Sequence, residues 1–130
     1  MANRSRGEVT LMIGEEEFIL RPTFEAMEQI EDRIGIGIPK LVEVCKSGEF
    51  KLRDIVTIIH VGIIAHNDGN QRGVPSRAEI GDKVMDAGLS AVVGQAAMVK
   101  FLIHGMAGSR KMEQLEEKPE VPNPPTRTAE

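Results

Sequence analysis

The sequence predicts an α+β domain that is mostly helical: an N-terminal β-hairpin, then about five helices and a disordered C-terminal tail. Three observations predict it. Apolar and polar residues alternate over about 8–21, with the period of a strand. From about 23 to 108 the apolar residues recur at helical spacing, between capping and glycine signals. The stretch 113–130 is rich in Pro and Glu. We therefore expect a single folded domain over 1–112 and a disordered tail over 113–130.

The hairpin is predicted by two short alternating runs on either side of a turn. Val9, Leu11 and Ile13 form the apolar side of the first run. Gly14 supplies the positive φ that a tight turn requires, and Pro22 ends the second run. Because a lone hairpin is marginally stable in water, we expect it to pack on the helices or to pair with the edge of another chain.

Two short amphipathic helices are predicted next. Thr23 is suited to cap the first helix, which Gly35 ends. Pro39 suits the first turn of the second helix, which Gly48 ends. Further along, the segment 76–79 (SRAE) is a capping box and predicts a helix that ends at Gly88.

Two more helices, about 52–66 and about 89–106, are apolar around almost their whole circumference. Such a helix either lies buried on all sides or offers a second apolar face to a partner. Because a domain of this size buries a limited fraction of its surface, we infer partner binding or self-association and leave the buried alternative open. The residues that we assign to partner binding are Ile59, Ile63, Ile64, Met98, Leu102 and Met106.

The composition is poor in aromatic residues and rich in methionine. The 130 residues are 41% hydrophobic, which excludes disorder throughout, but they include no Trp and no Tyr. With few aromatic side chains for base stacking and a formal net charge of −4, direct nucleic-acid binding is not expected. Four of the seven methionines suit either a permissive binding surface or the core: Met12, Met85, Met98 and Met106.

Cysteine content and the length of the apolar runs predict a cytoplasmic protein. Cys45 is alone and cannot form an internal disulfide. The first residues carry two arginines but no apolar segment of the signal-peptide type. The longest apolar run, 55–65, is too short to cross a bilayer, so no membrane partner is expected.

Residues that commonly carry catalysis or bind metals form no recognisable pattern. His60 and His66 are six positions apart on one predicted helix, so they point to different faces. Cys45 lies on an apolar helix face, which indicates a core residue rather than a reactive thiol. The segment 35–37 lacks the strand and third glycine of a dinucleotide loop, and Ser90 lies between two helices, outside a nucleophile's usual context. We expect no enzyme, no cofactor and no metal site.

Several segments resemble the small tail proteins of gene transfer agents and related tailed phages. In chain order they are 6–11 (RGEVTL), 20–27 (LRPTFEAM), 30–35 (IEDRIG), 48–55 (GEFKLRDI) and 86–89 (DAGL). Glu31 and Gly35 have the spacing of the family's helix end. Met27 stands where the family usually has Leu, and Lys51 replaces a small polar residue that would cap the following helix. The likeness covers roughly residues 6 to 105.

This resemblance implies a protein of tail morphogenesis, in a bacterial host and of prophage-like origin. The function that it implies first is a tail-assembly chaperone, which binds the tape-measure protein and keeps it soluble. A structural component of the tail tube or of a connector is the alternative. The tape-measure protein or another tail protein is the expected partner, and self-association to a homo-oligomer is a further expectation. The resemblance supplies no catalytic or binding residues.

Overall fold

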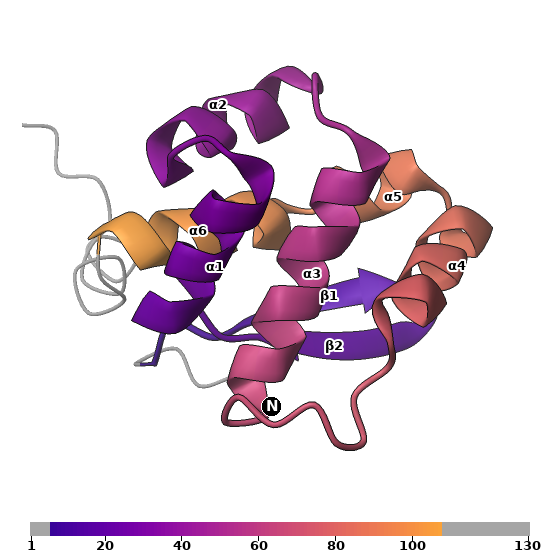
Figure 1. Cartoon of the computed structure of the whole chain (residues 1–130). Helices are drawn as coiled ribbons and strands as arrows, with labels where there is room; N and C mark the ends of the chain where they lie inside the picture. Colours follow the sequence, from indigo (N-terminus) through magenta and orange to yellow (C-terminus); the bar gives the residue numbers. More distant parts are fainter. Residues whose placement is uncertain (1–5, 108–130) are drawn as a thin grey trace, which may run out of the picture.

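The computed structural model describes residues 6–107, which form one β-hairpin and six helices (Figure 1). The elements are β1 (Val9–Ile13), β2 (Glu16–Leu20), α1 (Phe24–Ile34), α2 (Ile38–Ser47), α3 (Leu52–His66), α4 (Arg77–Ala87), α5 (Leu89–Val93) and α6 (Ala96–Ala107). This confirms the mostly helical α+β fold with an N-terminal hairpin. The predicted tail, 113–130, lies outside the described residues, as do the last residues of the predicted domain, 108–112.

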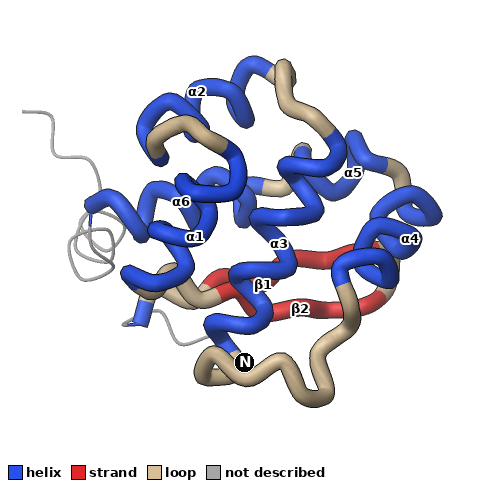
Figure 2. The backbone as a smooth tube through the Cα atoms, in the orientation of Figure 1, coloured by secondary structure: helices blue, strands red, loops and turns tan. Residues whose placement is uncertain are grey.

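The hairpin is antiparallel, with a register that runs from Val9 opposite Leu20 to Ile13 opposite Glu16. Gly14 has a φ of 67° at the first of the two turn positions, the conformation that a type II′ turn requires there. Alternate side chains of both strands are buried: Val9, Leu11, Ile13, Phe18 and Leu20. Figure 2 shows the strands in the lower part of the molecule, with α3 crossing them, and α3 contacts β2. The hairpin thus packs its apolar face on the helices of its own chain.

Helix α3 is the centre of the fold. It contacts β2, α1 and α4, and most of its side chains from Ile55 to Ile63 are buried. Its all-round apolar surface is therefore used inside the domain. Gly62 makes the crossing with β2 close, because a Cβ atom there would lie 2.9 Å from Cβ of Leu20. The carbonyl oxygen of Gly62 accepts a hydrogen bond of 3.1 Å from the backbone N–H of Arg21, which fixes the end of β2 against the helix.

The predicted caps at the starts of α1 and α4 are present in the structure. Oγ1 of Thr23 accepts a hydrogen bond of 3.0 Å from the N–H of Ala26 at the start of α1. Both hydrogen bonds of the capping box between Ser76 and Glu79 are present at the start of α4. Lys51 precedes α3 and makes no side-chain capping bond, as its departure from the family pattern predicts.

The single helix predicted over about 89–106 is wrong. The chain forms α5 and α6 instead, with a break at Gly94 and Gln95. The side-chain amide of Gln95 donates to the carbonyl oxygen of Met12 and accepts from its N–H. A residue whose side chain pairs with the backbone of a strand is held by a tertiary contact, which helical periodicity cannot predict. The break therefore serves the junction between α6 and β1.

Glu31 links α1 to α2 through its side chain. Its Oε2 accepts a hydrogen bond of 2.8 Å from the N–H of Ile38, the first residue of α2. The N-cap of α2 is Gly37, which has no side chain to make this bond. The carboxylate of Glu31 thus serves as the cap of the next helix, a position where negative charge is favourable.

A Glu31→Ala variant is expected to lose about 1 kcal/mol of unfolding free energy, the usual value of a helix cap. Urea unfolding followed by far-UV circular dichroism measures it, since the chain has no Trp or Tyr to report by fluorescence. Glu28→Ala is the matched control, because Glu28 is exposed on the same helix. Equal losses in the two variants would contradict the capping role.

Candidate partner-binding surface

Most of the side chains that the sequence assigned to partner binding lie in the core. Ile59, Met98 and Leu102 have no solvent exposure, and Ile63 is buried as well. The cause is the central place of α3 and the packing of α6 against α2 and β1. Their apolar surface is already covered by the same chain. Of the six residues, Ile64 is half-buried and Met106 is exposed.

The apolar side chains that the described structure exposes form a different set. The large ones are Met12, Phe24, Leu52, Met85 and Met106. Three of the four methionines considered for a permissive surface are among them, while Met98 fills the core. Phe24 is 78% exposed at the first position of α1. Leu52 and Met85 differ from the other three because they line one groove together.

This groove, which we call the α3–α4 groove, has a volume of about 330 Å³. Its lining comes from the start of α3 and from one face of α4: Leu52, Arg53, Val56, Arg77, Ala78, Gly81, Asp82 and Met85. Gly81 leaves room in it, since a Cβ atom at that position would lie 4.0 Å from Val56. Met85 is 62% exposed and Leu52 is 38% exposed. The groove thus combines an apolar lining with charged residues of both signs.

Arg77 holds the two helices of this groove together. Its Nε donates a hydrogen bond of 3.2 Å to Oγ1 of Thr57, and its Nη2 donates one of 2.9 Å to the carbonyl oxygen of Arg53. Oγ1 of Thr57 in turn donates to the carbonyl oxygen of Arg53 over 2.8 Å. Thr57, a polar position on an otherwise apolar helix, is therefore the docking point of α4. These bonds fix the width of the α3–α4 groove.

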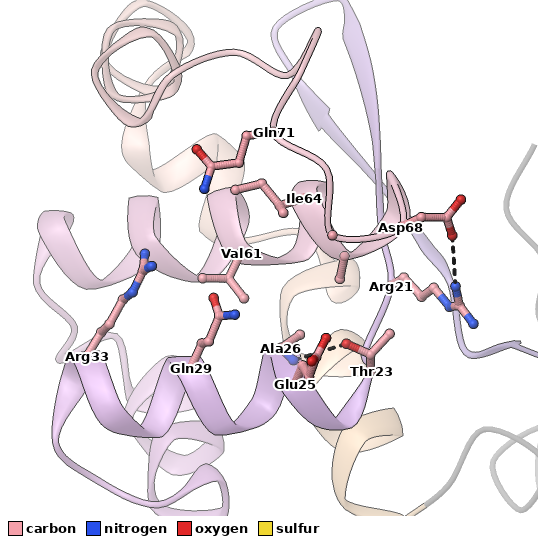
Figure 3. Close-up of a pocket in the computed structure, with 12 residues that line it drawn as sticks. Arg21, Thr23, Glu25, Ala26, Gln29, Arg33, Val61, Ile64, Asp68 and Gln71 are labelled. Carbon is pink, nitrogen blue, oxygen red and sulfur yellow. Dashed lines mark hydrogen bonds and ion pairs between the residues drawn. The ribbon is translucent and has the colours of Figure 1, made fainter.

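A larger hollow, of about 540 Å³, lies between α1 and the end of α3 and has a mainly polar lining (Figure 3). Arg33 and Gln29 from α1 and Gln71 from the loop after α3 project around it, and Nη1 of Arg21 lies 3.6 Å from Oδ1 of Asp68 at its edge. Because polar groups and exposed ion pairs add little to the binding of an apolar segment, this hollow suits such a partner less well than the α3–α4 groove.

His60, His66 and Cys45 lie among residues of the fold and do not form a cluster of catalytic groups. Burial lowers the pKa of His60, and the charges of Arg33 and Arg77 lower it further. Nδ1 of His66 lies 3.3 Å from Oε2 of Glu8, a buried carboxylate. Cys45 is buried, as predicted for a core residue, and burial raises the pKa of its thiol, so the thiol form predominates at neutral pH. Within residues 6–107 no three His, Cys, Asp or Glu side chains come together as a metal site would require.

Met85 was expected to suit a permissive surface, but its groove with Leu52 was not predicted from the sequence. A signal was present, because Ala78, Gly81 and Met85 recur at spacings of three and four along α4 and share one face. That face is distinct from the buried stripe of Ile80 and Val84. Small residues beside a methionine form a shallow apolar strip, and its signal in the sequence is weaker than that of large aliphatic residues.

The described residues thus form a small α+β domain with an exposed apolar groove, the kind of surface by which proteins bind other proteins. The family model described as phage tail tube protein, GTA-gp10, matches residues 6–99. The chain therefore belongs to this family, which confirms the resemblance to small tail proteins of gene transfer agents and phages. The family is one of phage tail proteins and not of enzymes.

Comparison with curated proteins and with solved structures gives no match. In the part of the chain that the structure describes, no helix is long and apolar enough to cross a membrane.

Proposed function

We propose that this protein is a tail-assembly chaperone that binds the tape-measure protein, and that the α3–α4 groove is the binding site. The observation that carries the proposal is the pairing of Leu52 and Met85, two exposed apolar side chains, at one groove. A chaperone acts on its client in the cytoplasm of the host, before the client is built into a particle.

The chemistry of the groove suits an amphipathic helix of the client. Helices commonly bind in grooves with their apolar face inward and their polar flanks at the rim. Met85 can adapt to different apolar side chains, because methionine is unbranched and polarizable. Arg53, Arg77 and Asp82 offer charges of both signs to the flanks of such a helix. The site therefore favours apolar helical segments without requiring one particular sequence.

Co-expression with the tape-measure protein tests this function. We expect more soluble tape-measure protein with the wild-type chain, and about tenfold weaker binding with Met85→Glu, which places a carboxylate in an apolar contact. Met12→Glu is the matched control, because Met12 is exposed on β1 and does not line the groove. Met106→Glu tests the one exposed methionine among the residues assigned from the sequence, and we expect it to bind nearly as well as wild type.

Two outcomes contradict the proposal in different ways. If the tape-measure protein is no more soluble with the wild-type chain than without it, the chaperone function fails. If the wild-type chain works and Met85→Glu works equally well, the function stands and the assignment of the groove fails.

A structural part of the tail tube or of a connector is the second candidate, favoured by the description of the family as a tail tube protein. The two functions predict different particles. Mass spectrometry of purified particles finds a structural component in stoichiometric amounts, whereas a chaperone is absent from them or present in traces. Stoichiometric presence would therefore overturn the chaperone proposal.

A further inference from the structure

The backbone of β2 has an open edge, which follows from the register of the hairpin. Thr10 lies opposite Ile19, and Met12 lies opposite Glu17. Gln95, outside the sheet, takes both the N–H and the carbonyl oxygen of Met12. The backbone groups of Met12 therefore point away from β2. In an antiparallel ladder the backbone N–H and carbonyl groups of the residue directly opposite then also point outward, away from the partner strand. The same holds for every second residue along each strand. The backbone groups of Glu17 and Ile19 thus point to the outer edge of β2.

The two edges of the hairpin differ in their hydrogen-bond partners. Gln95 occupies the edge of β1 with its side-chain amide. On the edge of β2, the N–H of Arg21 donates to Gly62 and its carbonyl oxygen accepts from Thr23, so this residue is satisfied within the domain. Among residues 6–107, nothing pairs with the backbone groups of Glu17 and Ile19. Two N–H groups and two carbonyl groups remain for another strand.

A groove of about 400 Å³ runs beside this edge, between β2, the end of α3 and the segment 73–75. Ile63 from α3 and Val74 and Pro75 from the loop contribute apolar surface to it. An added strand presents alternate side chains to the two faces of the sheet. In β2 itself, Phe18 and Leu20 on one face are buried in the core, while Glu17 is exposed and Ile19 half-buried on the other face.

We propose that a second copy of this chain occupies the edge, with the two β2 strands antiparallel and Glu17 opposite Ile19 of the other copy. In this register the unpaired groups of each copy match those of the other, because Glu17 and Ile19 exchange hydrogen bonds at both ends of the contact. The two hairpins then form one four-stranded sheet. Such a sheet removes an exposed edge, which a two-stranded hairpin otherwise leaves open to wrong partners.

The charges of β2 agree with this orientation. Glu15, Glu16 and Glu17 lie at one end of the strand and Arg21 lies just past the other. Antiparallel pairing brings Arg21 of one copy opposite Glu15 of the other and diagonal to Glu17, within reach of long side chains. Parallel pairing would place the acidic ends side by side, where like charges repel. The acidic end of β2 thus faces Arg21 of a second copy.

Sedimentation of the full chain at millimolar concentration tests the proposal. We expect a reversible dimer in the wild type, and about tenfold weaker dimerisation in two charge variants, Glu15→Arg/Glu17→Arg and Arg21→Glu, because each places like charges together. Their matched controls, Glu28→Arg/Glu43→Arg and Lys40→Glu, make the same charge changes on exposed helix positions away from β2. We expect these controls to dimerise like the wild type.

Mixing the two charge variants is the decisive step. In the mixed dimer, arginines at 15 and 17 face a glutamate at 21, and the wild-type contact at the other end is intact. We expect the mixture to dimerise about tenfold more strongly than either variant alone. A monomeric wild type, or a mixture no stronger than its components, would overturn the proposal. A wild type that stays monomeric but pairs this edge with another tail protein would likewise overturn the second copy as the occupant.

Discussion

A Gly62→Ala variant is expected to have a free energy of unfolding about 2 kcal/mol lower than the wild type. The added Cβ would lie 2.9 Å from Cβ of Leu20 and 3.1 Å from Cζ of Phe101. The Cβ of Leu20 is attached directly to the backbone of β2, so it cannot move aside as the end of a flexible side chain does. The clash can therefore be relieved only if α3 moves away from the hairpin. This movement would strain the hydrogen bond from the N–H of Arg21 to the carbonyl oxygen of Gly62.

Gly81→Ala is the matched control for this variant. Both glycines lie inside helices, where alanine is favoured by about 0.5–1 kcal/mol when it fits. At Gly81 the nearest atom to the new Cβ is 4.0 Å away, so we expect this variant to be as stable as the wild type or more so. Urea unfolding by circular dichroism compares the two. A Gly62→Ala variant at least as stable as Gly81→Ala would contradict the close crossing of α3 and β2.

A Phe101→Ala variant is expected to lose about 3–5 kcal/mol, as large core aromatics do when truncated. Phe101 has no solvent exposure and reaches from α6 to the point where Gly62 of α3 meets Leu20 of β2. With few aromatic residues in the chain, no comparable side chain is available to refill the cavity. Because small domains have only about 5–15 kcal/mol of stability, this loss leaves the fold marginal.

Phe24→Ala makes the same chemical change at an exposed site and is expected to alter stability by less than about 0.5 kcal/mol. If Phe101→Ala fails to fold, Phe101→Leu keeps the prediction measurable, with an expected loss of about 1.5 kcal/mol. Equal effects at Phe101 and Phe24 would show that α6 does not pack at the centre of the domain.

The local features of the fold could be predicted because they depend on neighbouring residues. Gly14 forms the turn, Thr23 and Ser76 cap their helices, and α3 has the expected bounds. Each of these follows from a backbone conformation or a hydrogen bond that spans a few positions. The continuous helix over 89–106 was wrong because Gln95 binds Met12, which is far away in the sequence.

The exposure of the apolar side chains could not be predicted in the same way. Apolar residues such as Ile59 and Leu102 have the same chemistry whether they lie inside a domain or on it. Periodicity marks them as apolar helix faces, but burial depends on which other elements cover those faces. The structure covers them and exposes Leu52 and Met85 instead.

The sequence by itself determined the hairpin, most of the helix ends and membership of a phage tail protein family. It also determined that residues 1–112 are nearly neutral, because 113–130 contains five Glu but only one Lys and one Arg and so carries most of the net charge of −4. Only the tertiary structure decided that α3 is enclosed, that Gln95 covers one edge of the hairpin and that no backbone group within residues 6–107 pairs with Glu17 and Ile19 at the edge of β2. The reason is physical: local sequence sets φ, ψ and hydrogen bonds within a segment, whereas exposure is a property of contacts between segments distant in the chain.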